Sequence, residues 1–196
     1  MFEKVKTGFV PGSFKPFTKG HYWLIQQASK ECDKLYIIVS TLDRIGKEKD
    51  EITIKGNSMV KIWSKYLLQI MPQNAEILFV DKSPMKIVYD MLSSEEEIEK
   101  ENKNINNHTK IYEFIIYGAD ENVKNAFNYK ILRKIAPTLL ENWKITIKIF
   151  PRLYNISGTN MRKYLFNNKK NDFIFNLPEP IRKYGNEIWS ILKENE

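Results

Sequence analysis

Five short apolar runs alternate along this chain with segments of helical periodicity. Each run is long enough for one strand, and each gap leaves room for a helix that crosses to the next strand. The runs cover residues 5–10, 35–40, 77–80, 112–117 and 145–150. Strands that alternate with helices pair in parallel, and right-handed crossovers place helices on both faces of the sheet. The sequence therefore predicts an α/β protein with a parallel sheet.

Between the runs, apolar residues recur at the spacing of an amphipathic helix. The expected helices cover residues 21–31, 55–70, 85–92 and 121–135, with two more after Gly158 and over 180–192. Residues 93–110 interrupt the pattern because they are nearly all polar or charged. They are expected to form an exposed helix end followed by a mobile loop.

Length and hydropathy narrow the class of protein. With 196 residues, 42% of them hydrophobic, the chain is expected to fold as one domain over 1–196, with 170–196 as a C-terminal helical extension. No apolar stretch reaches the roughly 18 residues that a membrane span needs, and the sequence does not begin with a signal-type segment. A cytoplasmic protein without membrane association is expected, and a homo-oligomer stays open.

The charge distribution argues against a dedicated nucleic-acid binder. The chain contains 31 Lys and Arg and 24 Asp and Glu, which gives a net charge of +7. The basic residues are scattered, and no zinc-finger, basic-zipper or aromatic RNA-recognition pattern accompanies them. An anionic small molecule is therefore the simpler partner for this charge.

The first candidate site lies where the amino-terminal strand run ends. The run breaks at Pro11-Gly12, and a helical pattern begins near Gly20. A tight loop between a strand and a helix points its amides, and the free N–H groups of the helix start, in one direction. The macrodipole adds roughly half a positive charge there. We therefore expect an anion-binding loop over residues 11–21.

A second segment has similar properties far along the chain. Residues 156–162 read Ile-Ser-Gly-Thr-Asn-Met-Arg and follow the last predicted strand. Ser157 and Thr159 offer hydroxyls at another helix start, and Arg162 can reach back as a charge-assisted fork. In parallel α/β sheets, ligands bind beyond the carboxyl ends of the strands. Both segments are expected to meet at that edge.

Residues 12–21, Gly-Ser-Phe-Lys-Pro-Phe-Thr-Lys-Gly-His, resemble the signature G-[ST]-F-x-P-x-[HT]-x-G-H of the nucleotidylyltransferase superfamily, and every fixed position matches. Residues 156–162 are similar to the second signature of that superfamily, in its ISGTxxR variant. A looser resemblance to phage-encoded members extends over residues 39–44, 51–53 and 62–63. The resemblance implies a Rossmann-like fold with a five-stranded parallel sheet.

The resemblance also implies a reaction. A phosphate oxygen of an acceptor attacks the α-phosphorus of a nucleoside triphosphate and releases pyrophosphate, with no need for a protein nucleophile. Such a site must hold two anions together, which positioned donors achieve. No cluster of carboxylate, His or Cys residues has metal-ligand spacing, so Mg²⁺ is expected to arrive on the triphosphate.

The resemblance also implies roles in this reaction for individual residues. The resemblance implies catalytic roles for Thr18, His21, Arg162 and Lys15. It implies nucleotide contacts for Gly12, Ser13, Phe14, Gly20, Gly118, Asp120, Ser157, Gly158 and Thr159. Arg44 and Ser83 end the second and third strands, where contacts with the acceptor are expected.

Two of these residues have open alternatives. Lys15 stands where the family often has an acidic residue or Gln, so it either contacts the incoming phosphate or lies exposed. Asp120 either touches the nucleotide or caps the helix that follows it. Trp23, Trp63, Trp143 and Trp189 lie in apolar patterns and are expected in the core.

The substrates are less constrained than the reaction. ATP is favoured over CTP as the donor, and nicotinamide mononucleotide is the first candidate for the acceptor. The alternative is a cytidylyltransferase that charges a phosphorylated alcohol with CMP. An alternative of another class is a non-catalytic nucleotide-binding or nucleic-acid-binding protein with the same fold. Release of pyrophosphate distinguishes the enzymes from the last of these.

Overall fold

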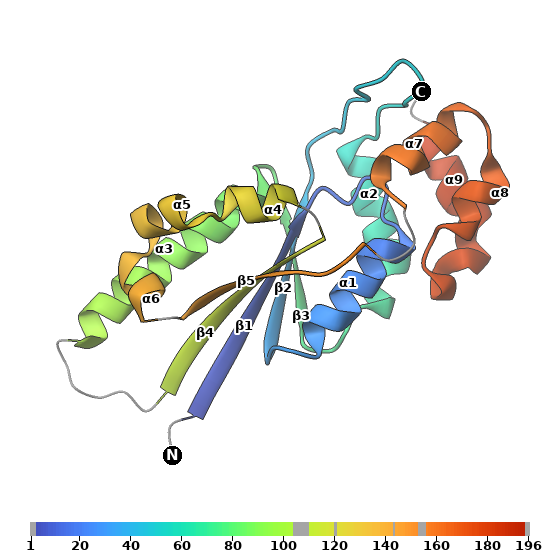
Figure 1. Ribbon diagram of the computed structural model, residues 1–196. Helices are drawn as coiled ribbons and strands as arrows, with labels where there is room; N and C mark the ends of the chain where they lie inside the picture. Colours follow the sequence, from blue (N-terminus) through green and yellow to red (C-terminus); the bar gives the residue numbers. More distant parts are fainter. Residues whose placement is uncertain (1–2, 104–109, 120, 143, 153–155, 195–196) are drawn as a thin grey trace.

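A parallel sheet of five strands forms the centre of the protein (Figure 1). The computed structural model describes residues 3–103, 110–119, 121–142, 144–152 and 156–194. The strands lie in the order β3-β2-β1-β4-β5, and each neighbouring pair is parallel. Their bounds are β1 Glu3–Gly12, β2 Lys34–Ser40, β3 Ala75–Val80, β4 Lys110–Gly118 and β5 Ile145–Ile149. The predicted fold class and all five predicted strands are confirmed.

Successive residues of the strands point to opposite faces, and both faces are buried. On β1, Phe9 belongs to one hydrophobic cluster and its neighbour Val10 belongs to the other. The Phe9 ring stacks on Tyr36 of β2 at 5.8 Å and on Phe114 of β4 at 6.3 Å. Burial on both faces explains why the strands read as continuous apolar runs rather than as alternating ones.

Two groups of helices cover the two faces (Figure 1). One face carries α1 Lys19–Ser29, α2 Gly56–Ile62, the π-helical turn η1 Trp63–Leu67, the 3₁₀ turn η2 Leu68–Ile70, α7 Gly158–Phe166, α8 Lys170–Phe175, the 3₁₀ helix η4 Glu179–Tyr184 and α9 Gly185–Lys193. The other face carries α3 Pro84–Lys103, α4 Glu121–Ala126, α5 Tyr129–Ile135 and α6 Pro137–Glu141. Among the described residues, no helix is long and apolar enough to cross a membrane.

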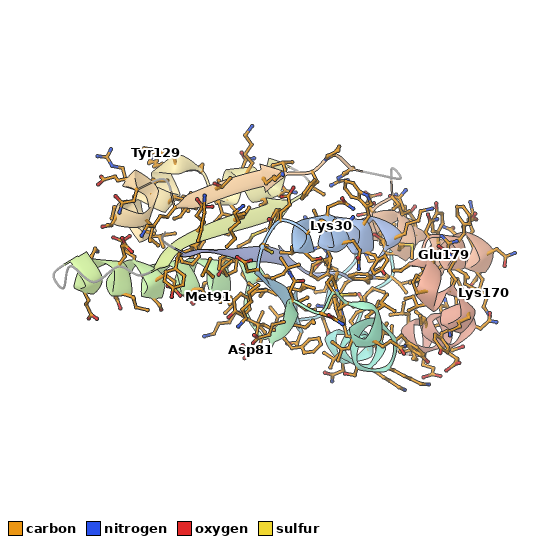
Figure 2. The ribbon with its side chains drawn as sticks, turned by 90° about the horizontal axis from the view of Figure 1, so that it is seen from below. Lys30, Asp81, Met91, Tyr129, Lys170 and Glu179 are labelled. Carbon is orange, nitrogen blue, oxygen red and sulfur yellow. The ribbon has the colours of Figure 1, made fainter. Side chains whose placement is uncertain are left out.

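The expected helix over 121–135 is divided in the structure. It ends at Ala126 and restarts at Tyr129, because the Asn128 side chain accepts a hydrogen bond from the Ile131 amide at 3.2 Å and caps α5. In Figure 2, Tyr129 and Met91 of one group of helices lie in the left half of the view, and Lys170 and Glu179 of the other group lie at the right.

The polar stretch after residue 93 is less exposed than expected. α3 continues to Lys103, and Glu96 and Glu99 are buried on the side of α3 that faces α6. Glu96 accepts hydrogen bonds from the Thr138 and Leu139 amides, and Glu99 pairs with Lys144 at 2.8 Å. The expectation of an exposed helix end is wrong for this side of α3, because those carboxylates have partners far along the chain. Of the expected segment 93–110, residues 104–109 lie outside the described residues, so the loop predicted to follow the helix end is not tested there.

The segment expected to be a C-terminal helical extension packs into the larger core. Phe173 of α8, Ile181 of η4 and Ile188 of α9 are buried in the same cluster as Ile25 of α1 and Trp63 of η1. These helices therefore lie beside the helices that follow β1 and β2 (Figure 1).

Candidate functional site

A cavity of about 410 Å³ opens at the carboxyl ends of β1 and β4. Its walls come from the loop after β1, from the start of α1, from the end of β4 and from the start of α7. The predicted site residues that line it are Gly12, Ser13, Phe14, Lys15, Thr18, Gly20, His21, Arg44, Gly118, Ser157, Gly158, Thr159 and Arg162. The two motif segments, which begin 144 residues apart at Gly12 and Ile156, thus share one cavity.

Of the predicted site residues that the structure describes, one is not part of this wall. Ser83 is exposed at the start of α3 and does not line the cavity, whereas Met85, two residues later, does. Asp120 lies outside the described residues, so neither of its two expected roles is tested.

Phe14 anchors the loop after β1. Its φ of 51° lies in the left-handed region, and its side chain is buried. The ring packs against Phe17 and Trp63 with centroids 5.7 and 5.9 Å away. A Cβ at Gly12 would fall 2.7 Å from the Phe14 ring, so only glycine permits this close approach.

Thr18 and His21 cap α1 reciprocally. The Thr18 hydroxyl accepts a hydrogen bond from the His21 amide at 3.2 Å, and His21 Nδ1 accepts one from the Thr18 amide at 3.1 Å. Because Nδ1 accepts, the neutral imidazole carries its proton on Nε2. The Phe14 and Phe17 rings lie 5.2 and 5.6 Å from the imidazole and hold its plane. The capping geometry therefore presents an N–H donor at the start of the helix.

Lys15 is buried, so the alternative that it lies exposed is wrong. Only 2% of its surface is accessible, and its ammonium donates a hydrogen bond to the Ser40 carbonyl at the end of β2. Burial lowers the pKa of the Lys15 ammonium to about 8, and the negative charge of Asp43 opposes that shift only in part. The cavity wall thus contains a cation whose charge is sensitive to mildly alkaline pH.

Arg162 links the second segment to the first. Its Nη1 donates to the Lys15 carbonyl at 2.9 Å and its Nη2 to the Thr159 hydroxyl at 3.0 Å. Its Nε donates to Glu51 at 2.6 Å, and both side chains are almost completely buried. A Cβ at Gly158 would lie 3.2 Å from the Lys15 carbonyl oxygen, so the start of α7 packs directly on the loop. The guanidinium lines the cavity while protein groups fix its orientation.

Ser157 caps α7, the second helix that begins at the cavity. Its hydroxyl accepts a hydrogen bond from the Asn160 amide at 3.1 Å. α1 and α7 therefore both direct amino ends toward the cavity, and their dipoles favour an anion there.

Sequence reasoning missed several residues of the wall, and Trp23 is the largest. It was expected in the core, but it is half-buried and lines the cavity. Its ring packs edge-to-face on Phe150 at 5.8 Å, and Phe150 stacks on Tyr117 at the same distance. Its place two residues after His21, near the start of α1, is the signal that could have found it. The other missed residues include Met85, Asn122 and Arg152.

The described residues contain no group of three or more His, Cys, Asp or Glu side chains that could hold a metal ion.

Comparison with known protein families gives a match over most of the chain. The citrate lyase ligase C-terminal domain family matches residues 13–184. Phosphopantetheine adenylyltransferase of Clostridium botulinum (strain Hall) is 57% identical over 35 residues, which is 18% of this chain and 21% of that protein. The similarity thus spans about a fifth of the length of the curated relatives that match.

Solved structures share the fold over almost the whole chain. Plasmodium falciparum nicotinic acid mononucleotide adenylyltransferase, complexed with NaAD, has a TM-score of 0.57 and 16% identity, and covers 96% of this chain and 98% of its own. The bifunctional NMN adenylyltransferase/ADP ribose pyrophosphatase of Francisella tularensis has a TM-score of 0.53 and 15% identity, and covers 100% of this chain and 54% of its own. At these identities the likeness concerns the fold.

Proposed function

Since this chain belongs to the citrate lyase ligase C-terminal domain family, which is nucleotidylyltransferase-like, we propose that it transfers the adenylyl group of ATP to a phosphorylated small molecule. One observation carries the proposal. The Arg162 guanidinium donates to the Lys15 carbonyl, which joins the two motif segments around one cavity with a helix start on each side. Such a cavity suits a triphosphate because amides, helix dipoles and a guanidinium all favour negative charge.

The reaction needs no covalent enzyme intermediate. An oxygen of the acceptor phosphate forms a bond to the α-phosphorus, the bond from that phosphorus to the bridging oxygen breaks, and pyrophosphate leaves with the electron pair. Charge accumulates on the oxygens around phosphorus during this step, so preorganised donors lower the barrier.

Each residue of the wall has a role in this proposal. His21 donates a hydrogen bond from its Nε2–H to a triphosphate oxygen, and the Thr18 amide holds the ring. Arg162 binds the β- or γ-phosphate with the edge of its fork. Lys15 neutralises charge between the donor and the acceptor phosphate, and Arg44 binds the acceptor. The amides of Gly12, Ser13 and the start of α7 complete the cradle.

The triphosphate is proposed to enter as its magnesium complex. In that complex the phosphate oxygens are the main ligands of the cation.

Nicotinamide mononucleotide is the first acceptor that we propose. Proteins of the same fold carry the names of NMN and nicotinic acid mononucleotide adenylyltransferases, and the short curated similarity is to a phosphopantetheine adenylyltransferase. All of these names specify adenylyl transfer, which favours ATP over CTP. The half-buried Trp23 offers a flat apolar surface to a ring of either substrate.

Pyrophosphate release tests the function. Purified protein is incubated with Mg²⁺, with ATP or CTP, and with nicotinamide mononucleotide, nicotinate mononucleotide, 4′-phosphopantetheine or a phosphorylated alcohol. Mass analysis identifies the product. We expect pyrophosphate and a dinucleotide from ATP and nicotinamide mononucleotide. Nucleotide binding without pyrophosphate from any pair would instead indicate a non-catalytic binding protein.

A further inference from the structure

Arg162 of the cavity wall forms a buried ion pair with Glu51, and the reaction as described so far gives Glu51 no role. Glu51 and Arg162 lie 2.6 Å apart, and their side chains are 2% and 4% exposed. They are 111 residues apart in the sequence, so the pair forms only in the folded protein. Removing one member of such a pair leaves a buried charge without its counterion.

Glu51 belongs to the connection between β2 and α2, residues 41–55, which is fixed at both of its ends. Arg44 and Ile54 form an antiparallel bridge with amide-to-carbonyl distances of 2.8 and 2.9 Å. Asp43 accepts a hydrogen bond from the Gly56 amide at 2.8 Å and so caps α2. Because Arg44 lines the cavity, this connection carries a proposed acceptor contact as well as the counterion of Arg162.

A second attachment of the same connection is more exposed. Lys163, the neighbour of Arg162 on α7, pairs with Glu48 and with Asp50. Glu48 is 57% exposed, and a surface pair of this kind contributes little to stability. The pairs of Lys163 do not involve Arg162, so the buried pair with Glu51 is the contact of this connection that fixes the Arg162 guanidinium.

At Arg162, each of the three nitrogens donates to a different protein acceptor, and Glu51 is the charged one. A guanidinium has five N–H donors, so these three bonds leave one N–H on each terminal nitrogen to be accounted for. Glu51 binds the Nε side, which turns the two terminal nitrogens together toward the loop and the start of α7.

We propose that Glu51 is a positioning residue for the triphosphate. It holds the Arg162 fork so that the terminal nitrogens meet a phosphate as a pair, and it ties that fork to the connection that carries Arg44. This inference rests on the proposed function, since it requires a triphosphate in the cavity. A fixed fork loses less conformational entropy when an anion binds than a free one does.

The test compares Glu51→Gln with Glu48→Gln. Each variant removes one negative charge from the same connection, and only the first changes the partner of Arg162. Titration calorimetry measures the binding of sodium tripolyphosphate, ATP and adenosine, without acceptor, after circular dichroism has shown that the variants are folded.

We expect Glu51→Gln to bind tripolyphosphate and ATP about five- to tenfold more weakly, the effect of weakening one charge-assisted hydrogen bond, and to bind adenosine as the wild type does. Glu48→Gln should bind all three ligands unchanged. Equal or tighter binding of tripolyphosphate by Glu51→Gln would overturn the proposal, because it would mean that Glu51 is only structural or that it masks Arg162.

Two further outcomes are decisive. If the wild type binds neither ATP nor tripolyphosphate, the proposed function fails and the positioning role fails with it.

If Glu51→Gln does not fold, Glu51→Asp takes its place, because it retains the charge and withdraws the carboxylate by one methylene. Weaker tripolyphosphate binding by Glu51→Asp, with Glu48→Asp unchanged, supports the proposal, and unchanged binding by both overturns it.

Discussion

At the scale of single residues, the site depends on side chains that the surrounding chain holds in one orientation. His21 is fixed by the Thr18 amide and by two phenylalanine rings, and Arg162 by three acceptors. Orientation of this kind is what a transition-state donor requires, since misplaced donors contribute little.

Replacing the imidazole should affect turnover far more than folding. We expect His21→Ala to lower kcat for pyrophosphate release by about a hundredfold or more, the usual effect of removing a transition-state donor. The lost capping contact should reduce the free energy of unfolding by only about 1 kcal/mol. Assays at saturating ATP measure kcat, and a urea titration measures the free energy of unfolding. A kcat close to that of the wild type would reject the role of His21.

The charge state of Lys15 makes a prediction for pH. In the ligand-free protein its pKa is about 8, so the ammonium is charged below that value and neutral above it. A bound triphosphate favours the charged form, and its affinity should therefore fall as the pH rises from about 7.5 to about 9.5. Calorimetry of ATP binding across this range measures the trend, and Lys15→Met should flatten it. A profile that is the same in both proteins would assign the trend to another group.

At the scale of elements, buried carboxylates decide how α3 packs. Glu96 accepts two amide hydrogen bonds at the start of α6, which is where a negative charge also suits the helix dipole. Composition predicts a solvated segment because four of residues 95–99 are Glu, yet helical spacing puts Glu96 and Glu99 on one side and Glu97 on another. Periodicity was therefore a better guide here than polarity.

Glu96→Ala should destabilise the fold, because it leaves two helix-start amides without their acceptor. We expect a loss of about 2–4 kcal/mol in the free energy of unfolding, measured by urea denaturation at neutral pH. Glu97→Ala, at an exposed position next to it, should change stability by less than about 0.5 kcal/mol. Similar effects of the two substitutions would contradict the capping role.

The same contact makes the free energy of unfolding depend on pH. Burial acts to raise the pKa of Glu96, but the hydrogen bonds from Thr138, Leu139 and Lys100 together outweigh it, so the pKa is lowered on folding. The stabilisation is complete above the ordinary Glu pKa of about 4.3 and is lost as the pH falls through the lowered value in the folded state. The difference in stability between wild type and Glu96→Gln should therefore shrink below about pH 4, and a constant difference would argue against an ionised Glu96.

At the scale of the whole molecule, the last helices share the core of the sheet. Ile188 of α9 is 1% exposed and lies in the cluster that contains Ile25 and Trp63. Tyr66 and Lys65 of η1 both bond to Glu187 of α9, at 2.7 and 2.9 Å. The helices after Lys170 should therefore unfold together with the sheet.

Ile188→Ala tests that cooperativity. Removal of a buried isoleucine side chain should cost about 2–5 kcal/mol in one two-state transition with an unchanged denaturant slope. Ile45→Ala is the matched control, because Ile45 is 71% exposed and its truncation should be nearly neutral. A separate early transition in the Ile188 variant would show that the C-terminal helices form an independent unit.

The sequence by itself determined the five strands, the parallel α/β class and the two motif segments that each lead into a helix. These features depend on local periodicity and on loops next to helix starts, which neighbouring residues specify. Only the tertiary structure decided that Lys15 is buried, that Trp23 lines the cavity, and that Glu51 and Glu96 are buried with partners 111 and about 42 residues away. Contacts at such separations depend on how the sheet and its two helical layers pack, and no local pattern encodes them.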